Sequence, residues 1–429
     1  MSSIKDLASD LYPFPYSITG PGNDNSIIRL CKELSFDIYK YSSGQSLNGW
    51  LIPPACIVEK AELRKNGELI YDGKISPLGV PSQSDSFVGE LLLDELKPHL
   101  FVSEDENAIP YHWTKLYRPD EPLWGFCMPK KLKDSLSEGT YSVELITKKV
   151  SASMKVMIYE LQGDSDEFIL LNAHNCHPYQ ANDDISGVAV GIDVMKRLAN
   201  LPSRRYSYRL MIAPELLGPM FWLNQVGENE WSKARGVILL KSVGNQRPLR
   251  LQQSFSGNTL IDRAAHHVFK HGYEKYSFGE FRAIYGNDET VFEAPPYCIP
   301  SVTLTRWPFP QYHSNLDTPD LLDDELLNDT AKTTFEICRT LELNISYKRN
   351  FSGLICLSRY GLYKSPPPQD VNGVDYYKSE RGRWSRLMNA LPSHLNDSVN
   401  LLELAELYEL PIADIYKYLE DWKDQGLVK

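Results

Sequence analysis

The sequence predicts an α/β fold, a mixed and mostly parallel sheet with helices on both of its faces. Short, continuously apolar segments such as FILLNAH (168–174) and GVILLKSVG (236–244) are typical of strands that are covered on both sides. Helical segments such as SGVAVGIDVMKRLANL (186–201) alternate with them. Strand–helix alternation of this kind indicates a sheet between two helical layers. We therefore assign residues 1–47 and 134–345 to one main domain.

A β-rich domain is predicted to interrupt the main domain at residues 48–133. Its segments are short and alternating, prolines punctuate them, and helical periodicity is scarce. Asn66-Gly67, in CIVEKAELRKNGELIYDG, is a residue pair preferred in two-residue β-hairpin turns. After this domain, YSVELITKKV (141–150) and MKVMIYELQG (154–163) have the pattern of two strands that pair with each other.

The C-terminal part of the chain changes character twice. Residues 346–385 are irregular, and the proline-rich SPPPQD at 365–370 is typical of a linker. Three short helical segments follow within 386–429, which predicts a small winged-helix domain. The last of them, at 412–425, carries four carboxylates and two lysines, so it would repel DNA phosphates. We therefore expect no nucleic-acid partner and interpret this domain as a packing module through which the chain could form a homo-oligomer.

Composition restricts the class and the compartment of the protein. A chain of 429 residues with 42% hydrophobic and 24% charged residues is globular, and its length predicts more than one domain. The net charge of −11 favours solubility. No segment reaches the roughly 18 consecutive apolar residues of a membrane span, and the N-terminus lacks a signal-peptide pattern. Together with seven scattered cysteines that form no Cys-x-x-Cys pair, this predicts a cytoplasmic protein without membrane attachment.

The densest group of metal-ligating residue types follows the strand FILLNAH, in HNCHPYQANDDISG. His174, His177, Asp183 and Asp184 lie within eleven residues at the carboxyl end of this strand, where active groups collect in open α/β sheets. Imidazole and carboxylate are the ligands of catalytic zinc. Because a single loop histidine or a helix-capping aspartate has a purely structural explanation, the prediction of a metal site depends on the whole cluster.

Two further polar residues follow later strands of the same predicted sheet. Glu215 ends YRLMIAPE and is placed to act as a general base, with a helix cap as its alternative role. His313, in RWPFPQYHSNLDTPDLL, follows the strand SVTLTR. A metal-bound histidine usually donates its second nitrogen to an acceptor, and Asp317 is a candidate for that acceptor.

These segments together resemble the co-catalytic zinc aminopeptidases. In that family an H-x-D strand end, a D-N-x-S-G loop, an E-E-x-G-L strand end and a Y-H-T-x-x-D-T segment surround two zinc ions. Here DDISG, PELLG and YHSNLDT occur in the same order. The whole chain resembles more closely a bacterial group of aminopeptidase-like proteins that have an inserted β domain and a C-terminal winged helix. That group has the patterns H-x-C-H-P-x-x-A-N-D-x-x-S-G, S-I-T-G-x-G, W-G-F-C and G-x-D-E, which here are HNCHPYQANDDISG, SITGPG at 17–22, WGFC at 124–127 and GNDE at 286–289.

The chain departs from the two-zinc pattern at two ligand positions. Leu216 stands where the family has its second glutamate, and Lys241 stands where the family has an aspartate. A lysine ammonium at that place could take the space and charge of one missing metal. The resemblance therefore implies at most one zinc per chain, held by Asp183, His313 and one more histidine.

The third protein ligand is His177 or His174. His174 matches the family's histidine, but His177 is closer to Asp183 in the sequence, so we favour His177. Asp184 is expected to support the site without binding the metal. Single-zinc relatives with this fold exist among the glutaminyl cyclases, so the loss of one metal does not imply the loss of chemistry.

The predicted function is that of a single-zinc metallohydrolase, with Glu215 as the general base, acting on an amide or peptide bond of a small substrate. Candidate substrate contacts are Asp288 and Glu289 for an amine, Arg306 for a carboxylate, and Tyr312 beside the metal. Two alternatives stay open. One is a binding or scaffold protein that kept the fold and lost catalysis, and the other is a zinc-dependent cyclase or deacylase that uses the same site.

Overall fold

The computed structural model describes residues 3–364 and 378–429. The predicted linker sequence SPPPQD lies outside these residues. The chain divides into two compact units. The first comprises the chain up to Gly257 together with Ser277–Lys332, and the second comprises Asn258–Tyr276 and Thr333–Lys429.

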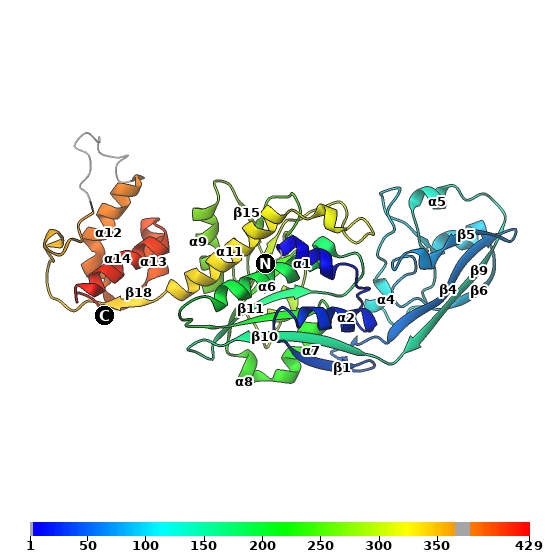
Figure 1. Ribbon diagram of the computed structural model, residues 1–429, viewed down its shortest axis with the longest axis horizontal. Helices are drawn as coiled ribbons and strands as arrows, with labels where there is room; N and C mark the ends of the chain where they lie inside the picture. Colours follow the sequence, from blue (N-terminus) through cyan, green and yellow to red (C-terminus); the bar gives the residue numbers. More distant parts are fainter. Residues whose placement is uncertain (1–2, 365–377) are drawn as a thin grey trace. The chain divides into compact units, whose positions relative to one another are not determined.

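An eight-stranded mixed sheet forms the centre of the first unit (Figure 1). Its four inner strands are parallel to one another, and antiparallel pairings join further strands on both sides. This arrangement confirms the predicted mixed sheet. In sheet order the strands are β1 (Asp37–Ser42), β10 (Ser153–Leu161), β12 (Ser207–Ala213), β11 (Phe168–His174), β13 (Ala234–Lys241), β16 (Ser301–Thr305), β14 (Arg250–Gln252) and β15 (Ser277–Gly279).

Helices cover both faces of this sheet because its inner strands are apolar on both sides. All seven residues of β11 are buried. On one face α6 packs closely, since Gly191 leaves room for the side chains of Leu210 and Leu240, and α1 lies beside α6 (Figure 1). On the other face α7 shares a hydrophobic core with β10, β11, β12 and β13. The helices that begin in this part of the chain are α1 (Ile4–Leu11), α2 (Pro21–Leu30), α6 (Ser186–Ala199), α7 (Leu217–Val226), α8 (Glu228–Trp231), α10 (Glu289–Phe292) and α11 (Asp324–Leu343).

The predicted β-rich insert forms a separate four-stranded sheet with its own hydrophobic core. Its first hairpin turns at Asn66-Gly67, where both residues have a positive φ, +49° and +83°, as a two-residue turn of this type requires. The hairpin prediction is therefore confirmed. In sheet order the strands are β5 (Glu68–Asp72), β4 (Ala55–Lys65), β9 (Thr140–Val150) and β6 (Phe87–Leu92), and the short helices are α3 (Leu93–Leu96), α4 (Thr114–Tyr117) and α5 (Lys130–Asp134).

Strand β9 extends the smaller sheet beyond the predicted boundary at residue 133. It pairs with β4 and β6, whereas β10 pairs with β1 and β12 of the central sheet. The prediction that 141–150 and 154–163 pair with each other was therefore wrong. The chain passes from one sheet to the other at Ser151-Ala152. An alternating pattern identifies a strand but not its partner. The remaining domain boundaries stay predictions.

The second unit consists mainly of helices. The three predicted C-terminal helices are present, and β17 (Ser346–Lys348) pairs antiparallel with β18 (Asn396–Asn400). Ion pairs from Arg263 to Glu406 and from Lys270 to Glu409 connect α9 with the C-terminal helices, although the sequence assigned α9 to the main domain. The winged-helix assignment and the homo-oligomer stay predictions. The helices are α9 (Leu260–Gly272), α12 (Glu380–His394), α13 (Leu401–Tyr408) and α14 (Ile412–Asp424).

A buried histidine is expected to make the second unit sensitive to acid. The ring of His267, in α9, accepts the backbone N–H of Ile412 at 3.1 Å. Burial, His271 and Lys270 lower the pKa of His267 to about 4. Because this folded-state pKa lies below the unfolded value of about 6.5, the stabilisation is complete above pH 6.5 and is lost as the pH falls toward 4, about 2 kcal/mol of it by pH 5.

Hydrogen–deuterium exchange tests this expectation. Protection of α9 and α14 amides should fall between pH 7 and pH 5 more steeply in the native protein than in His267→Gln, which keeps an acceptor and cannot gain a proton. If both proteins lose the same protection, the acid sensitivity comes from another group.

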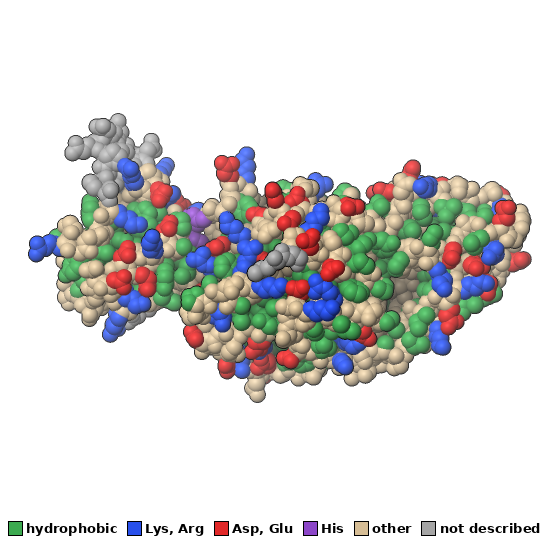
Figure 2. All heavy atoms as spheres, in the orientation of Figure 1, with side chains coloured by type: hydrophobic (Ala, Val, Ile, Leu, Met, Phe, Trp, Pro, Cys, Tyr) green, Lys and Arg blue, Asp and Glu red, His purple; other side chains and the backbone are tan. Residues whose placement is uncertain are grey.

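Charged side chains of both signs lie on the surface of the protein. Lys and Arg side chains are interspersed with Asp and Glu on the face shown in Figure 2. Within the described part of the chain, no helix has both the length and the apolar character that crossing a membrane requires. The expectations of no nucleic-acid partner and of a cytoplasmic location stay predictions.

Candidate metal centre and active site

Four of the predicted site residues come together because neighbouring parallel strands end at one edge of the sheet. His174 is the last residue of β11, and Lys241 is the last residue of β13. Glu215 follows the end of β12 by two residues, and Arg306 follows β16 directly. Since parallel strands place their carboxyl ends on the same side, the geometry of the sheet itself brings these positions together.

The loop after β11 is held in shape by two buried carboxylates. Asp317 accepts the backbone N–H groups of Asn182 and Asp183 at 2.7 and 3.0 Å. Asp184 accepts those of His174 and Ser242 at 3.2 and 3.0 Å. Asp317 was expected to orient His313; the structure instead has it fixing the backbone of Asp183. Both aspartates position the loop that carries the candidate ligands.

Three of the predicted ligands converge on one point. Oδ2 of Asp183 lies 3.6 Å from Nε2 of His177 and 3.5 Å from Nε2 of His313. These three ligand atoms are within 4.8 Å of one another, an arrangement that could hold a metal ion. Tyr111 stacks on His177 with a centroid distance of 4.5 Å, and Tyr312 stacks on His313 at 3.7 Å. The aromatic rings therefore restrain both imidazoles.

The protonation of the two histidines fits a metal site. Nδ1 of His177 lies 2.9 Å from the carbonyl oxygen of Pro178, and because a carbonyl only accepts, Nδ1 must be the protonated nitrogen. Nε2 of His177 is the nitrogen that faces Asp183, and this buried atom has no hydrogen-bond partner among the described residues. Burial and the neighbouring His177 hold the pKa of His313 well below its usual value, so His313 is neutral as well. Neutral imidazoles with fixed tautomers are what zinc requires.

Lys241 occupies the other side of Asp183. Its ammonium contacts Oδ1 of Asp183 and Nε2 of His174. Burial lowers the pKa of Lys241, but the carboxylates of Asp183 and Glu215 more than offset this effect and hold that pKa well above its usual value. In spite of burial, Lys241 and the adjacent imidazoles hold the pKa of Asp183 well below its usual range. The two groups therefore form a buried ion pair beside the three converging ligands.

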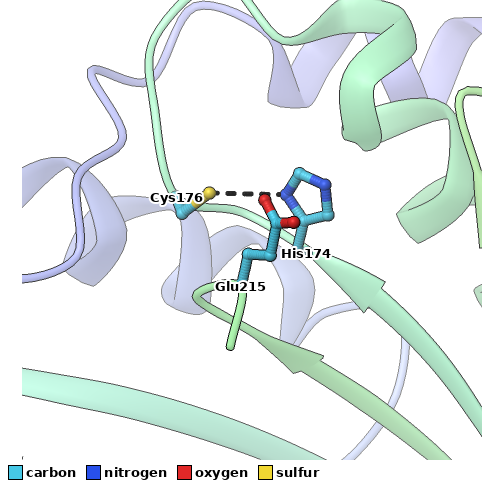
Figure 3. A group of neighbouring side chains, drawn as sticks. All are labelled: His174, Cys176 and Glu215. Atoms are coloured by element: carbon cyan, nitrogen blue, oxygen red, sulfur yellow. Dashed lines mark hydrogen bonds between the residues drawn. The ribbon is translucent and has the colours of Figure 1, made fainter. Parts of the chain in front are cut away.

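His174, Cys176 and Glu215 form a second group next to this ion pair (Figure 3). Their potential ligand atoms lie within 4.8 Å of one another, and Sγ of Cys176 is 3.4 Å from Nδ1 of His174. Burial and the charge of Glu215 raise the pKa of Cys176 well above its usual value, so its thiol stays protonated. Of the two histidines considered as the third ligand, His177 lies with His313 beside Oδ2 of Asp183, whereas His174 lies 3.3 Å from Oδ1 of Asp183 and also contacts Lys241. The choice of His177 as the ligand stays a prediction.

Arg306 does not fit the predicted role of a substrate contact. It is only 2% exposed. Its guanidinium donates to the carbonyl oxygens of Val243, Arg247 and Leu326 and to Oδ2 of Asp329 at 2.7 Å. Because its donors are engaged by the chain itself, Arg306 ties the end of β16 to α11.

Asp288 and Glu289 also face the chain rather than a substrate. Oδ1 of Asp288 accepts the backbone N–H of Leu216 at 2.6 Å, and both carboxylate oxygens of Glu289 accept that of Asn287 at 2.9 and 2.8 Å. Both residues are buried, and burial raises the pKa of each carboxyl group. The prediction that they bind a substrate amine therefore does not fit these positions.

A cavity of about 550 Å³ opens beside the candidate ligands. Glu215, His177, His313 and Tyr312 line it, so the predicted base, two ligands and one predicted substrate contact share one space. Most of the wall was not predicted from the sequence. The residues concerned are Ile18, Tyr111, Trp113, Thr114, Leu116, Tyr117, Arg118, Arg282, Tyr285 and Gly286. The spacing of residues in the sequence does not reveal that segment 111–118 lies near the motif GNDE at 286–289. The concentration of aromatic residues in YHWTKLY could, however, have pointed to this segment as part of a binding site.

Comparison with known proteins agrees with this architecture. A relative from Clostridium acetobutylicum, described as a candidate polysaccharide biosynthesis protein with an aminopeptidase-like domain, is 30% identical over 348 residues, 80% of this chain and 79% of the relative. The crystal structure of a candidate peptidase from Clostridium acetobutylicum matches with a TM-score of 0.82 at 26% identity and covers 99% of this chain and 95% of that chain. A zinc aminopeptidase from Bacillus subtilis matches with a TM-score of 0.60 at 14% identity, covering 78% of this chain and 92% of that chain, which shows a shared fold.

The sequence profile of a domain of unknown function, DUF4910, matches residues 5–344. This match spans most of the chain, including every candidate ligand and the whole cavity wall. The chain therefore belongs to the DUF4910 family and has the fold of the zinc aminopeptidases.

Proposed function

We propose that the protein is a single-zinc hydrolase of an amide bond. The observation that supports this most directly is the division of Asp183 between two kinds of partner. Oδ2 faces the Nε2 atoms of His177 and His313, and Oδ1 contacts the ammonium of Lys241. One cation position beside Asp183 is thus taken by a side chain, and the other is surrounded by ligand atoms. Two histidines and one carboxylate are a usual protein ligand set for catalytic zinc.

In this proposal Glu215 moves the proton. His177, Asp183 and His313 would hold a zinc ion, which when bound would supply Lewis-acid activation of a carbonyl group and of water. Glu215, on the cavity wall, takes a proton from the attacking water and delivers it to the leaving nitrogen of the amide. The hydroxyls of Tyr285 and Tyr312 are hydrogen-bonded to each other at 2.5 Å on the same wall. Burial raises the pKa of both, so they stay protonated; one hydroxyl donates to the other, and the accepting tyrosine keeps its own O–H to donate to the carbonyl oxygen of the substrate.

Metal content and hydrolysis together test this proposal. The purified full-length protein should contain one zinc per chain by elemental analysis, and a chelator should remove amide hydrolysis that added zinc restores. A protein that binds no divalent metal would support the scaffold alternative. Preference for an N-acylated sugar over aminoacyl amides would favour a deacylase, an alternative supported by the polysaccharide biosynthesis description of the relative.

Lys241→Asp is expected to raise the metal content from one zinc to two per chain. The substitution removes the ammonium and adds a carboxylate beside Nε2 of His174 and Oδ1 of Asp183, which creates a second set of three ligands. Elemental analysis and zinc titration measure the stoichiometry. Lys241→Met is the matched control, because it removes the charge without adding a ligand, and it should stay at one zinc. A Lys241→Asp protein that also stays at one would show that Lys241 does not stand in for a metal.

A further inference from the structure

The wall of the cavity has the wrong charge for a free amino terminus. Among the residues that line it, Glu215 is the one carboxylate, and the proposed reaction already uses it. The cations Arg118 and Arg282 lie on the same wall, and the rest is largely aromatic. A substrate ammonium in this cavity would therefore meet two positive side chains and compete with water for Glu215.

The carboxylates that could bind an ammonium stand behind the wall. Asp288 is fully buried, and its Oδ1 accepts the backbone N–H of Leu216, a wall residue. Its Oδ2 has no hydrogen-bond partner in the described structure, but it is enclosed by protein. Glu289 is occupied by the N–H of Asn287. Neither carboxylate lines the cavity.

Arg282 is held in place by its surroundings. Its own backbone has a φ of +58°, a left-handed conformation that few residues other than glycine adopt. Its guanidinium packs on the α-carbon of Gly286, where a Cβ atom would come within 2.2 Å of Nη2. Nη1 donates to the hydroxyl of Thr290. These contacts restrain the guanidinium of Arg282, which lines the cavity as a cationic group.

Arg118 approaches the cavity from the inserted domain. It directly follows α4, whose Tyr117 also lines the cavity. The ion pair of Arg118 with Glu121 is 3.5 Å long, and both side chains are more than half exposed, so it holds the guanidinium weakly. Arg118 can therefore turn to a ligand at little cost. Trp113, which also lines the cavity, packs edge-on against Tyr117 at 4.9 Å and adds a flat apolar surface to the wall.

We propose that the substrate is an amide that carries a carboxylate and has no free amino group beside the scissile bond. The chemical class is an N-acylated acidic compound, either an N-acyl amino acid or an N-acylated acidic sugar. Arg282 and Arg118 hold the carboxylate, since a guanidinium fork matches its two oxygens, and the tyrosine and tryptophan rings cover the remainder. This inference rests on the proposed hydrolase function for the reaction that the substrate undergoes. The preference for binding an anionic compound does not depend on that function.

Calorimetric binding to the zinc-loaded full-length protein, in parallel with hydrolysis, tests the substrate class. The amino-acid series is N-acetyl-L-leucine, N-acetyl-L-leucinamide and L-leucinamide, and the sugar series is N-acetylneuraminic acid and N-acetylglucosamine. In one of the two series we expect the anionic compound to bind at least about ten-fold more tightly than the uncharged compound. The series that shows this preference identifies the substrate as an N-acyl amino acid or as an N-acylated acidic sugar. Equal or tighter binding of L-leucinamide would overturn the inference.

Substitution of the arginines gives a second test. Arg282→Ala and Arg118→Ala should each raise KM or Kd for the anionic compound about 10–100-fold, the usual range for losing a charge-assisted contact, and leave the uncharged compounds unaffected. Arg282→Lys should recover part of the loss, and Gly286→Ala should weaken binding by displacing Arg282. Arg64→Ala removes a partly exposed arginine of the same inserted domain that does not line the cavity, and serves as the control. Loss of uncharged and anionic ligands alike would contradict the assignment.

Failure of this inference can be told apart from failure of the hydrolase proposal. The binding series is repeated with Glu215→Gln, which prevents turnover of the ligand. If no compound is hydrolysed by the native protein but the anionic preference persists, the hydrolase proposal fails and the inference stands. If L-leucinamide is the preferred compound in hydrolysis and in binding, the inference fails and the hydrolase proposal stands.

Discussion

Asp183→Ala should leave the protein without stoichiometric zinc and without amide hydrolysis. Asp183 is the one negative ligand among the three converging groups, and two neutral imidazoles cannot replace its charge. The expected result is less than a tenth of the native zinc content and no measurable turnover. Elemental analysis after dialysis, with zinc titration by calorimetry, measures the first effect independently of the second.

The same substitution leaves the buried ammonium of Lys241 without its carboxylate, which costs about 3–5 kcal/mol of stability for a buried pair. Asp183→Asn combined with Lys241→Met removes both charges and keeps the volumes similar, so it separates metal loss from misfolding. This double variant should melt close to the native protein and should still lack zinc. If either variant retains one zinc per chain with native affinity, the ligand set proposed here is incorrect.

Glu215→Gln should lower kcat by about 10²–10⁴-fold while zinc content and melting temperature stay the same. The amide keeps the size of the side chain and most of its hydrogen-bonding capacity, but it cannot accept a proton at neutral pH. Because Glu215 lines the cavity and is not one of the three converging ligands, metal binding should not depend on it. Steady-state kinetics on any turned-over substrate and elemental analysis give the two readouts.

Glu228→Gln, on the exposed helix α8, is a matched control and should be fully active. A metal-free Glu215→Gln protein would indicate that Glu215 is a ligand, as its proximity to His174 and Cys176 allows. A fully active Glu215→Gln protein would show that the general base is another carboxylate.

The fold was predictable where local pattern determines structure. The buried strands, the helices between them and the Asn66-Gly67 turn all follow from periodicity and turn chemistry within a few residues. The partners of β9 and β10 did not follow, because two successive alternating strands have the same appearance whether they form a hairpin or belong to two sheets.

The candidate site was predictable to a similar extent. His177, Asp183 and His313 were singled out because their residue types follow strand ends, and the parallel sheet places those ends together. The direction of a side chain at a strand end was not predictable, and Arg306 illustrates why. Its guanidinium is satisfied by carbonyl groups of α11 and of the loop after β13, which only the tertiary structure brings within reach.

The contribution of the inserted domain to the cavity wall has an evolutionary consequence. The groups assigned to bond cleavage come from the edge of the central sheet, whereas Tyr111, Trp113, Tyr117 and Arg118 come from the loop and short helix at 111–118, within the predicted insert. Mutations in that segment can therefore alter which molecule is admitted while the reacting groups keep their geometry. Family members are expected to diverge in selectivity by exchanging residues at 111–118, and grafting this segment between them offers a route to new specificities on an unchanged reaction centre.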